Sequence, residues 1–90
     1  MNTSTTAYSG GRLLRKGGVL EKFNICNSTL YIQVAGGLFP APVKIGPRAS
    51  AWPEREVDAV ISARIAGKTV DQIKALVKEL HVQRTAGEVM

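Results

Sequence analysis

Two segments near the start of the chain place hydrophobic residues three and four positions apart, as one face of a helix requires. The spacing predicts a helix over 17–23 and a second helix over 27–35. Asn24 tolerates the left-handed backbone that ends the first helix, and Gly36 and Gly37 end the second. Two helices separated by so few residues predict a helix-turn-helix. The apolar positions are Val19, Leu20 and Phe23 in the first helix and Leu30, Tyr31 and Val34 in the second.

After the second helix the pattern changes from helical to alternating. Residues 43–45 alternate apolar and charged side chains, residues 46–48 combine Gly, Pro and Arg, and residues 49–52 form a second short run. The pattern predicts a two-stranded hairpin, and the proline suits the second position of its turn because its backbone angle is already set. Lys44 and Arg48 flank the turn, so we expect a basic loop that projects from the body of the domain.

Two further helices are predicted in the second half of the chain. The first runs from Pro53, which suits a first helical turn because it lacks an amide hydrogen, to about Ala66. The second begins at Thr69, which forms a capping box with Gln72, and runs to about His81. The expected buried positions are Val57, Val60, Ile61 and Ile65 in the first helix, and Val70, Ile73, Leu76, Val77 and Leu80 in the second. The second set is a narrow seam that needs a partner surface, either the core of the same chain or another molecule.

The length of 90 residues, with 44% hydrophobic and 21% charged residues, predicts one small folded domain and excludes a multidomain enzyme. We expect a flexible leader over 1–12 and a folded unit over 13–67. A C-terminal helix over 68–81 would serve packing or self-association, and a flexible tail would follow over 82–90.

The net charge of +5 lies wholly in the first half of the chain. Residues 1–48 contain six basic residues and one acidic residue, whereas residues 49–90 contain six of each. This asymmetry favours nucleic acid as a partner, and the alternative is a role in solubility alone. Cys26 is the single cysteine, the start is polar, and no run approaches the roughly 18 apolar residues of a membrane span. We therefore expect a cytoplasmic protein without membrane contact.

No residues have the spacing of a catalytic or metal site. The single histidine, His81, lacks the cysteine or second histidine of a zinc site, and the glycine pairs lack the Lys-Ser or Lys-Thr of a phosphate loop. We therefore expect no enzyme activity, no metal and no cofactor. The large side chains Phe23, Phe39, Ile45 and Trp52 are expected to form the core. Cys26 is left without an assigned role.

Several short stretches between Leu14 and Ile61 form a recognisable series. They are Val19-Leu20, Ser28-Thr29-Leu30-Tyr31, the run over 37–49 that reads GLFPAPVKIGPRA, Ala51-Trp52, and Glu56-Val57. In residue type and spacing the series resembles the AlpA family of phage and prophage regulators, small relatives of excisionases. The resemblance covers roughly half of the chain. It implies a mainly α fold with a small β-hairpin, namely a MerR-like winged helix-turn-helix with an added C-terminal helix.

The resemblance also implies a function. A member of this family would be a sequence-specific transcriptional regulator of phage type that binds double-stranded DNA, with the helix over 28–35 in the major groove and the hairpin over 44–48 against the backbone. Cys26 and Asn27 stand where the family has Ser and Arg, and Ile32 stands where it tends to have Arg. Because two cations of the recognition helix are replaced, other basic residues are expected to carry more of the binding.

The predicted DNA contacts form three groups. Polar side chains of the recognition helix read base edges, cations of the wing contact phosphate or enter a minor groove, and basic residues near the first helix contact the backbone. The residues are Asn27, Ser28, Thr29, Tyr31, Ile32 and Gln33 in the recognition helix, Lys44 and Arg48 in the wing, and Arg15, Lys16 and Lys22 for the backbone. Tyr31 is equally compatible with a place in the core.

Two alternative functions stay open on the sequence. One is an excisionase-like factor that bends DNA and controls the direction of an integrase. The other is a protein-interaction module that uses the C-terminal helix. A homodimer or cooperative oligomer, an integrase and RNA polymerase are the protein partners to consider.

Overall fold

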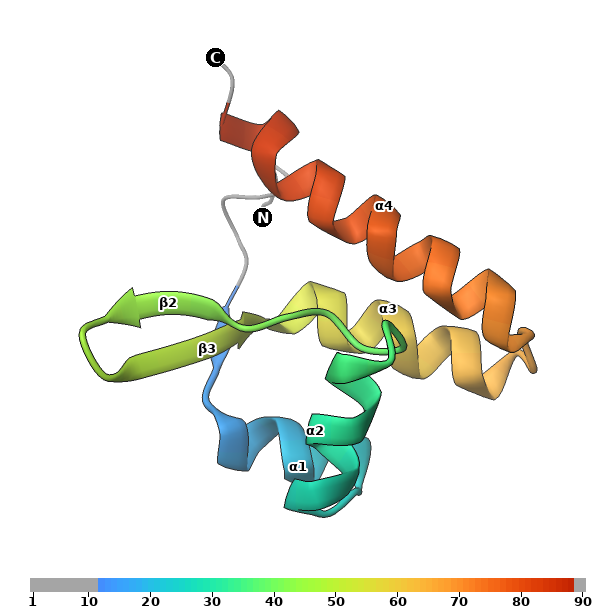
Figure 1. Ribbon diagram of the computed structural model, residues 1–90, viewed down its shortest axis with the longest axis horizontal. Helices are drawn as coiled ribbons and strands as arrows, with labels where there is room; N and C mark the ends of the chain where they lie inside the picture. The colour runs from blue at the N-terminus through green and yellow to red at the C-terminus, as the bar shows by residue number, and fades with distance from the viewer. Residues whose placement is uncertain (1–11, 89–90) are drawn as a thin grey trace, which may run out of the picture.

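A computed structural model describes residues 12–88, which form four helices and a three-stranded antiparallel sheet (Figure 1). The elements in chain order are β1 (Leu13–Leu14), α1 (Lys16–Phe23), α2 (Asn27–Ala35), β2 (Val43–Gly46), β3 (Ala49–Pro53), α3 (Glu54–Ile65) and α4 (Val70–Glu88). The predicted mainly α fold with a small β-hairpin is confirmed. The predicted leader, apart from Arg12, lies outside the described residues.

The predicted helix-turn-helix is present at the positions that the sequence indicates. α1 ends at Asn24, whose left-handed backbone (φ 61°) lets its N–H bond to the carbonyl of Leu20. α2 begins after Cys26, whose carbonyl accepts the N–H of Leu30 at 3.0 Å. Leu30 is fully buried and anchors α2 to the core. The opposite side of this short helix is therefore left at the surface.

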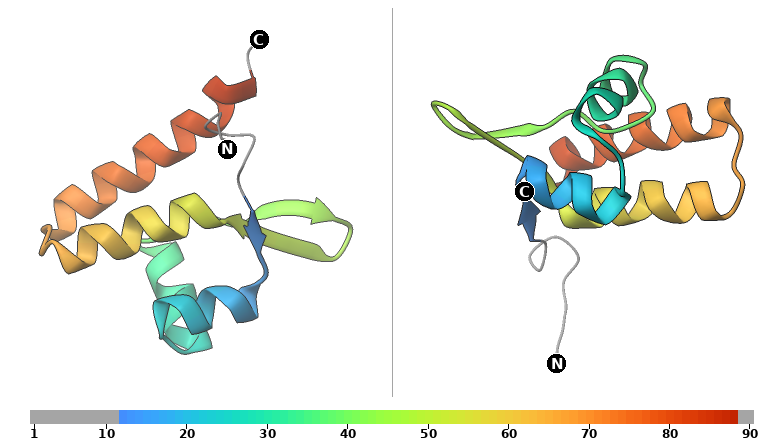
Figure 2. Two further views of the ribbon diagram at one scale, coloured as in Figure 1. Left: turned by 180° about the vertical axis from the view of Figure 1, so that it is seen from behind. Right: turned by 90° about the horizontal axis from the view of Figure 1, so that it is seen from below.

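The sheet contains one strand that the sequence pattern does not reveal. β2 and β3 form the predicted hairpin, with Lys44 opposite Ser50, and β1 pairs with the other edge of β3, where Leu14 lies opposite Trp52. The strand order is β1-β3-β2. A strand of two residues is too short to show alternation. The hairpin projects away from the helices as the wing, defined here as residues 43–53 (Figure 2).

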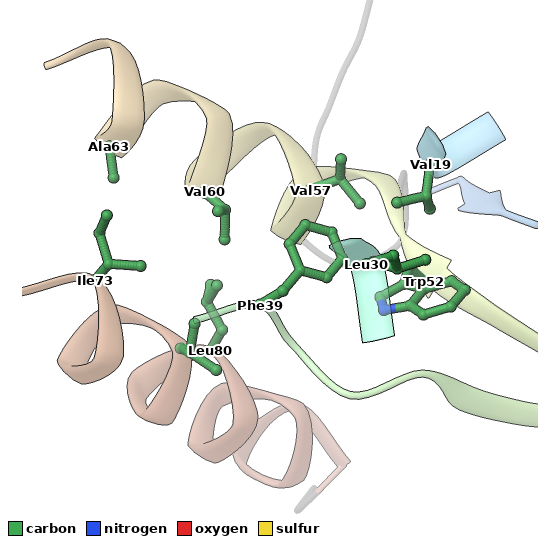
Figure 3. Packing of buried hydrophobic residues seen from close by; sticks show 10 residues of the cluster. Val19, Leu30, Phe39, Trp52, Val57, Val60, Ala63, Ile73 and Leu80 are labelled. Carbon is green, nitrogen blue, oxygen red and sulfur yellow. The ribbon is translucent and has the colours of Figure 1, made fainter. Parts of the chain in front are cut away.

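The hydrophobic core lies between the helix-turn-helix and the pair of helices α3 and α4. Phe39, from the loop before the wing, lies at its centre (Figure 3). Its ring stacks on that of Phe23 with 5.4 Å between ring centroids. Its ring centroid lies 6.3 Å from that of Trp52. Around these rings the other fully enclosed aliphatic side chains include Val19, Leu30, Val57, Val60 and Ile73. The predicted core places for Phe39 and Trp52 are confirmed, and Phe23 packs against the cluster partly buried.

Three predicted core positions are wrong. Ile45 lies on the projecting wing and is 45% exposed, Ile65 is 82% exposed, and Val70 is also exposed. The buried face of α3 is rotated away from Ile65 because it includes Ala63 and a carboxylate, Glu56. Because Glu56 is charged, a prediction based on hydrophobic positions does not count it as buried and therefore assigns the wrong buried face to α3.

α4 is longer than predicted and packs on its own chain. The predicted capping box is confirmed: the Thr69 N–H donates to Gln72 Oε1 at 2.9 Å, and the Gln72 N–H donates to Thr69 Oγ1 at 3.2 Å. The helix continues through His81 to Glu88, so residues 82–88, expected in a flexible tail, are helical. The buried members of its seam, Ile73, Val77 and Leu80, join the core opposite α3. The seam thus finds a partner surface within the same molecule.

Candidate nucleic-acid interface

The outer face of α2, defined as Ser28, Tyr31, Ile32 and Ala35, consists of exposed side chains. These positions are three and four residues apart and therefore share one side of the helix. Tyr31 is 57% exposed and Ile32 is 68% exposed, whereas Leu30 on the other side has no exposed surface. Tyr31 is therefore a surface residue and does not belong to the core.

The other predicted residues of α2 differ from one another in exposure. Asn27 is exposed at the start of the helix, whereas Thr29 and Gln33 are half-buried. The guanidinium of Arg64, in the last turn of α3, donates a hydrogen bond to Gln33 Oε1 at 2.5 Å. Because Arg64 lies 31 residues away in sequence, no local pattern places this cation beside α2. The fold adds it to the candidate interface.

A groove of about 600 Å³ runs between the start of α1, α2 and the wing. Arg15, immediately before α1, and Lys16, its first residue, line the groove together with Tyr31 of α2 and Arg48 of the wing. The Lys16 ammonium donates a hydrogen bond to Tyr31 Oη at 3.2 Å and lies 5.3 Å from the centre of the ring. Four of the predicted contact residues, from three different elements, thus meet in one groove.

In the part of the chain that the structure describes, the cations that line the groove and the wing have no carboxylate partner. Lys44 and Arg48 are exposed on the wing, which projects away from the helices (Figure 2). Within residues 12–88, no ion pair involves Lys44, Arg48, Arg15 or Lys16. Their positive charge is therefore available to an anionic partner.

Lys22 has different surroundings from the other predicted cations. Its ammonium lies 2.7 Å from a carboxylate oxygen of Glu54 and 2.8 Å from one of Asp58, on α3. The contact with Asp58, and then that with Glu54, raises the pKa of Lys22 above its usual value. In turn Lys22, with a smaller contribution from Arg12, holds the pKa of Glu54 below its usual range. The structure therefore uses Lys22 to join α1 to α3, outside the groove.

Cys26 is an exposed thiol immediately before α2. The hydroxyls of Ser28 and Thr29 lie 3.5 and 3.2 Å from its sulfur. Hydrogen bonds from Ser28 first and then Thr29 stabilise the thiolate and lower the pKa of Cys26 to about 6. Cys26 has no role assigned from the sequence, and its place before α2 beside two hydroxyls gives the thiol this lowered pKa.

The base of the wing is fastened to the helices by hydrogen bonds. Trp52 Nε1 donates to the carbonyl of Pro40 at 2.8 Å. The N–H of Ala41 donates to His81 Nε2 at 3.1 Å, and the carbonyl of Ala41 accepts from Arg84 at 2.7 Å. Two side chains of α4 thus fix the segment that leads into the wing. Arg84 lies in the region that the sequence assigns to a tail.

The structure also limits other kinds of site. No helix within residues 12–88 combines the length and the apolar character needed to cross a membrane. In the same part of the chain, no three His, Cys, Asp or Glu residues are arranged to hold a metal ion. The groove and the outer face of α2 present cationic, hydroxyl and apolar groups.

Comparison with known proteins identifies the family. The family model described as prophage CP4-57 regulatory protein (AlpA) matches residues 12–65, which include α2 and the wing. Uncharacterized protein ORF88 of Enterobacteria phage P4 is 37% identical over 57 residues, or 63% of this chain. The match spans 65% of that protein, slightly less than two thirds of its length. No solved structure matches the chain significantly. The resemblance found in the sequence is confirmed, and the chain belongs to the AlpA family of prophage regulatory proteins.

Proposed function

We propose that this protein is a sequence-specific DNA-binding regulator of transcription, with α2 in the major groove and the wing against the backbone. One observation carries the proposal: Tyr31 of α2, the start of α1 and the wing border a single groove whose cations have no carboxylate partner within residues 12–88. A duplex presents the complementary polyanion. Membership of a family of phage regulators supports the same function.

α2 has the size and the side chains of a recognition helix. The major groove is about 12 Å wide and admits one α-helix, whose hydroxyl and amide groups can bond to base edges. Asn27 and Ser28 are exposed for this role. Gln33 is less free because Arg64 engages its amide oxygen, which leaves its NH2 group as the donor. Base reading is therefore assigned chiefly to the first turn and the outer face of α2.

The groove supplies contacts to the sugar-phosphate backbone. Arg15, Lys16 and Arg48 line it, and Lys44 lies on β2 of the wing, opposite Ser50 and closer to the helices than the turn that holds Arg48. Because Lys16 donates to Tyr31 Oη, the phenolic proton is left to donate to a phosphate oxygen. Such contacts fix the position and orientation of the protein on DNA and carry little sequence information.

A binding titration at several salt concentrations tests the proposal. The protein is added to fluorescent duplexes of host or phage promoter sequence and of unrelated sequence, and anisotropy is recorded. We expect binding to weaken linearly on a log–log plot of affinity against salt, with a slope of about −3.6 if four phosphates are neutralised. Absence of binding to any duplex at low salt would refute DNA binding.

A genome-wide footprint of the bound protein tests the regulatory role. We expect sites that overlap promoters, where a bound protein blocks or recruits polymerase. Sites confined to integration junctions would instead assign the protein to the control of recombination, and DNA binding would stand in either case.

A further inference from the structure

The outer face of α2 is electrically neutral although the protein carries a net charge of +5. No Lys, Arg, Asp or Glu occurs anywhere in α2, whose sequence is NSTLYIQVA. Its outer face therefore offers a partner hydroxyl groups, a methyl group and the branched side chain of Ile32. These groups suit contacts with bases better than ion pairs with phosphates.

Cations from other elements border this neutral face on both sides. Lys16 of α1 bonds to Tyr31 on one flank of α2, and Arg64 of α3 bonds to Gln33 on the other. Ile32 lies between these two positions in sequence and around the helix, and it is 68% exposed. A neutral centre with cationic flanks matches the major groove, where phosphates form the rims and base edges form the floor.

Ile32 has no hydrogen-bonding atom in its side chain, so it can recognise a base only by apolar contact. The C5 methyl of thymine is the apolar group on the major-groove edges of the bases. As an extension of the proposed DNA-binding function, on which it depends, we infer that Ile32 contacts the methyl group of a thymine in the binding site. The contact would make the protein prefer thymine at that position over a pyrimidine without the methyl.

Removal of a single methyl from the DNA isolates this contact. The probe is the tightest-binding duplex recovered from a random-sequence library by repeated selection with the full chain. Each thymine is replaced in turn by deoxyuridine, which keeps the pairing and removes the methyl. We expect one of these thymine-to-uracil replacements, or one in each half-site, to weaken binding about fourfold, which is the effect of losing one buried methyl-sized group. The other replacements should have little effect on affinity.

Two exposed isoleucines provide a variant and its matched control. In Ile32→Ala, the thymine and uracil probes are expected to bind equally at the sensitive position. Ile65→Ala removes an exposed isoleucine at the end of α3, outside the proposed DNA contacts, and should keep the fourfold difference. Because both side chains are exposed, circular dichroism and the Tm should change little in either variant.

The possible outcomes distinguish this inference from the proposed DNA-binding function on which it depends. Specific DNA binding that is insensitive to every uracil replacement overturns the role of Ile32 and leaves DNA binding intact. A uracil effect that persists in Ile32→Ala, or disappears in Ile65→Ala, also overturns it. A protein that selects no duplex at all, even at low salt, refutes the proposed function and the inference together.

Discussion

Arg84 and Glu56 form a two-pronged ion pair between α4 and α3. Arg84 Nε lies 2.9 Å from Glu56 Oε2, and Arg84 Nη2 lies 2.6 Å from Oε1. Glu56 has no exposed surface, and the same Nη2 group donates to the carbonyl of Ala41 before the wing. One side chain near the end of the protein therefore neutralises a buried carboxylate and fixes the approach to the wing.

The first prediction is that Arg84→Ala destabilises the protein strongly. Removal of one partner from a buried ion pair leaves an uncompensated charge, so we expect the free energy of unfolding to fall by about 3 kcal/mol. Urea denaturation followed by the fluorescence of Trp52, the single tryptophan, measures the change. Lys78→Ala, at an exposed position of α4, is the control and should change stability by less than about 0.5 kcal/mol.

A double variant checks the reason for this loss. In Glu56→Leu with Arg84→Met both charges are removed, so stability should exceed that of Arg84→Ala. Equal stability of Arg84→Ala and the wild type would show that the pair contributes nothing to the fold.

The wing provides the second prediction. Charge reversal in Lys44→Glu with Arg48→Glu should weaken binding to specific and unrelated duplexes alike and flatten the dependence on salt, because phosphate contacts are lost. Lys68→Glu is the control, since Lys68 is exposed at the α3–α4 turn, far from the wing (Figure 1). Salt titrations of the three proteins measure both quantities. An equal loss of affinity in the Lys68 variant would indicate a general effect of charge.

Local sequence patterns account for most of the fold. The helical spacing around Leu30 predicts α2 with its observed bounds, Asn24 predicts the end of α1, and Thr69 with Gln72 predicts the start of α4. Each of these signals involves residues within a few positions of one another. The remaining features depend on partners distant in sequence, such as Glu56, whose burial needs a guanidinium 28 residues away.

The same limit applies to the candidate site. The sequence identifies the cations and the polar residues of α2, but it does not separate paired from unpaired charges. Lys22 and Lys16 look alike in the sequence, and only the fold brings two carboxylates of α3 to the first and Tyr31 to the second. Arg64 reaches α2 in the same way, through tertiary packing.

This difference between the two lysines gives the third prediction. Lys16→Met should weaken DNA binding and reduce the salt slope by about one unit, because one phosphate contact is lost. Lys22→Met should leave the slope unchanged, since its charge is compensated by Glu54 and Asp58. The measurement is the same salt titration for both variants. If Lys22→Met reduces the slope as much as Lys16→Met, the ion pairs with α3 do not hold in the complex.

Lys22→Met should instead change how the stability of the protein depends on pH in the acid range. The pKa of Glu54 is lowered in the folded state, first by Lys22, so this carboxylate stabilises the fold above its ordinary pKa of about 4.3. The contribution is lost as the pH falls through the lowered value. The difference in Tm between pH 7 and pH 3 should therefore be smaller in Lys22→Met than in the wild type. An unchanged difference would mean that the pair does not contribute to pH-dependent stability.

The fourth prediction concerns the thiol before the recognition helix. Because the pKa of Cys26 is lowered to about 6, its alkylation by iodoacetamide should reach half of its maximal rate near that pH, well below the value of about 8.5 for an ordinary thiol. Ser28→Ala should move the midpoint upward, since Ser28 provides the largest stabilisation of the thiolate. Ser50→Ala is the control, and its hydroxyl lies in the wing. Mass spectrometry of the modified protein gives the rates, and a wild-type midpoint of 8 or higher would contradict the proposed hydrogen bonds to the sulfur. A saturating duplex should slow the reaction at every pH, because the proposed complex covers the start of α2.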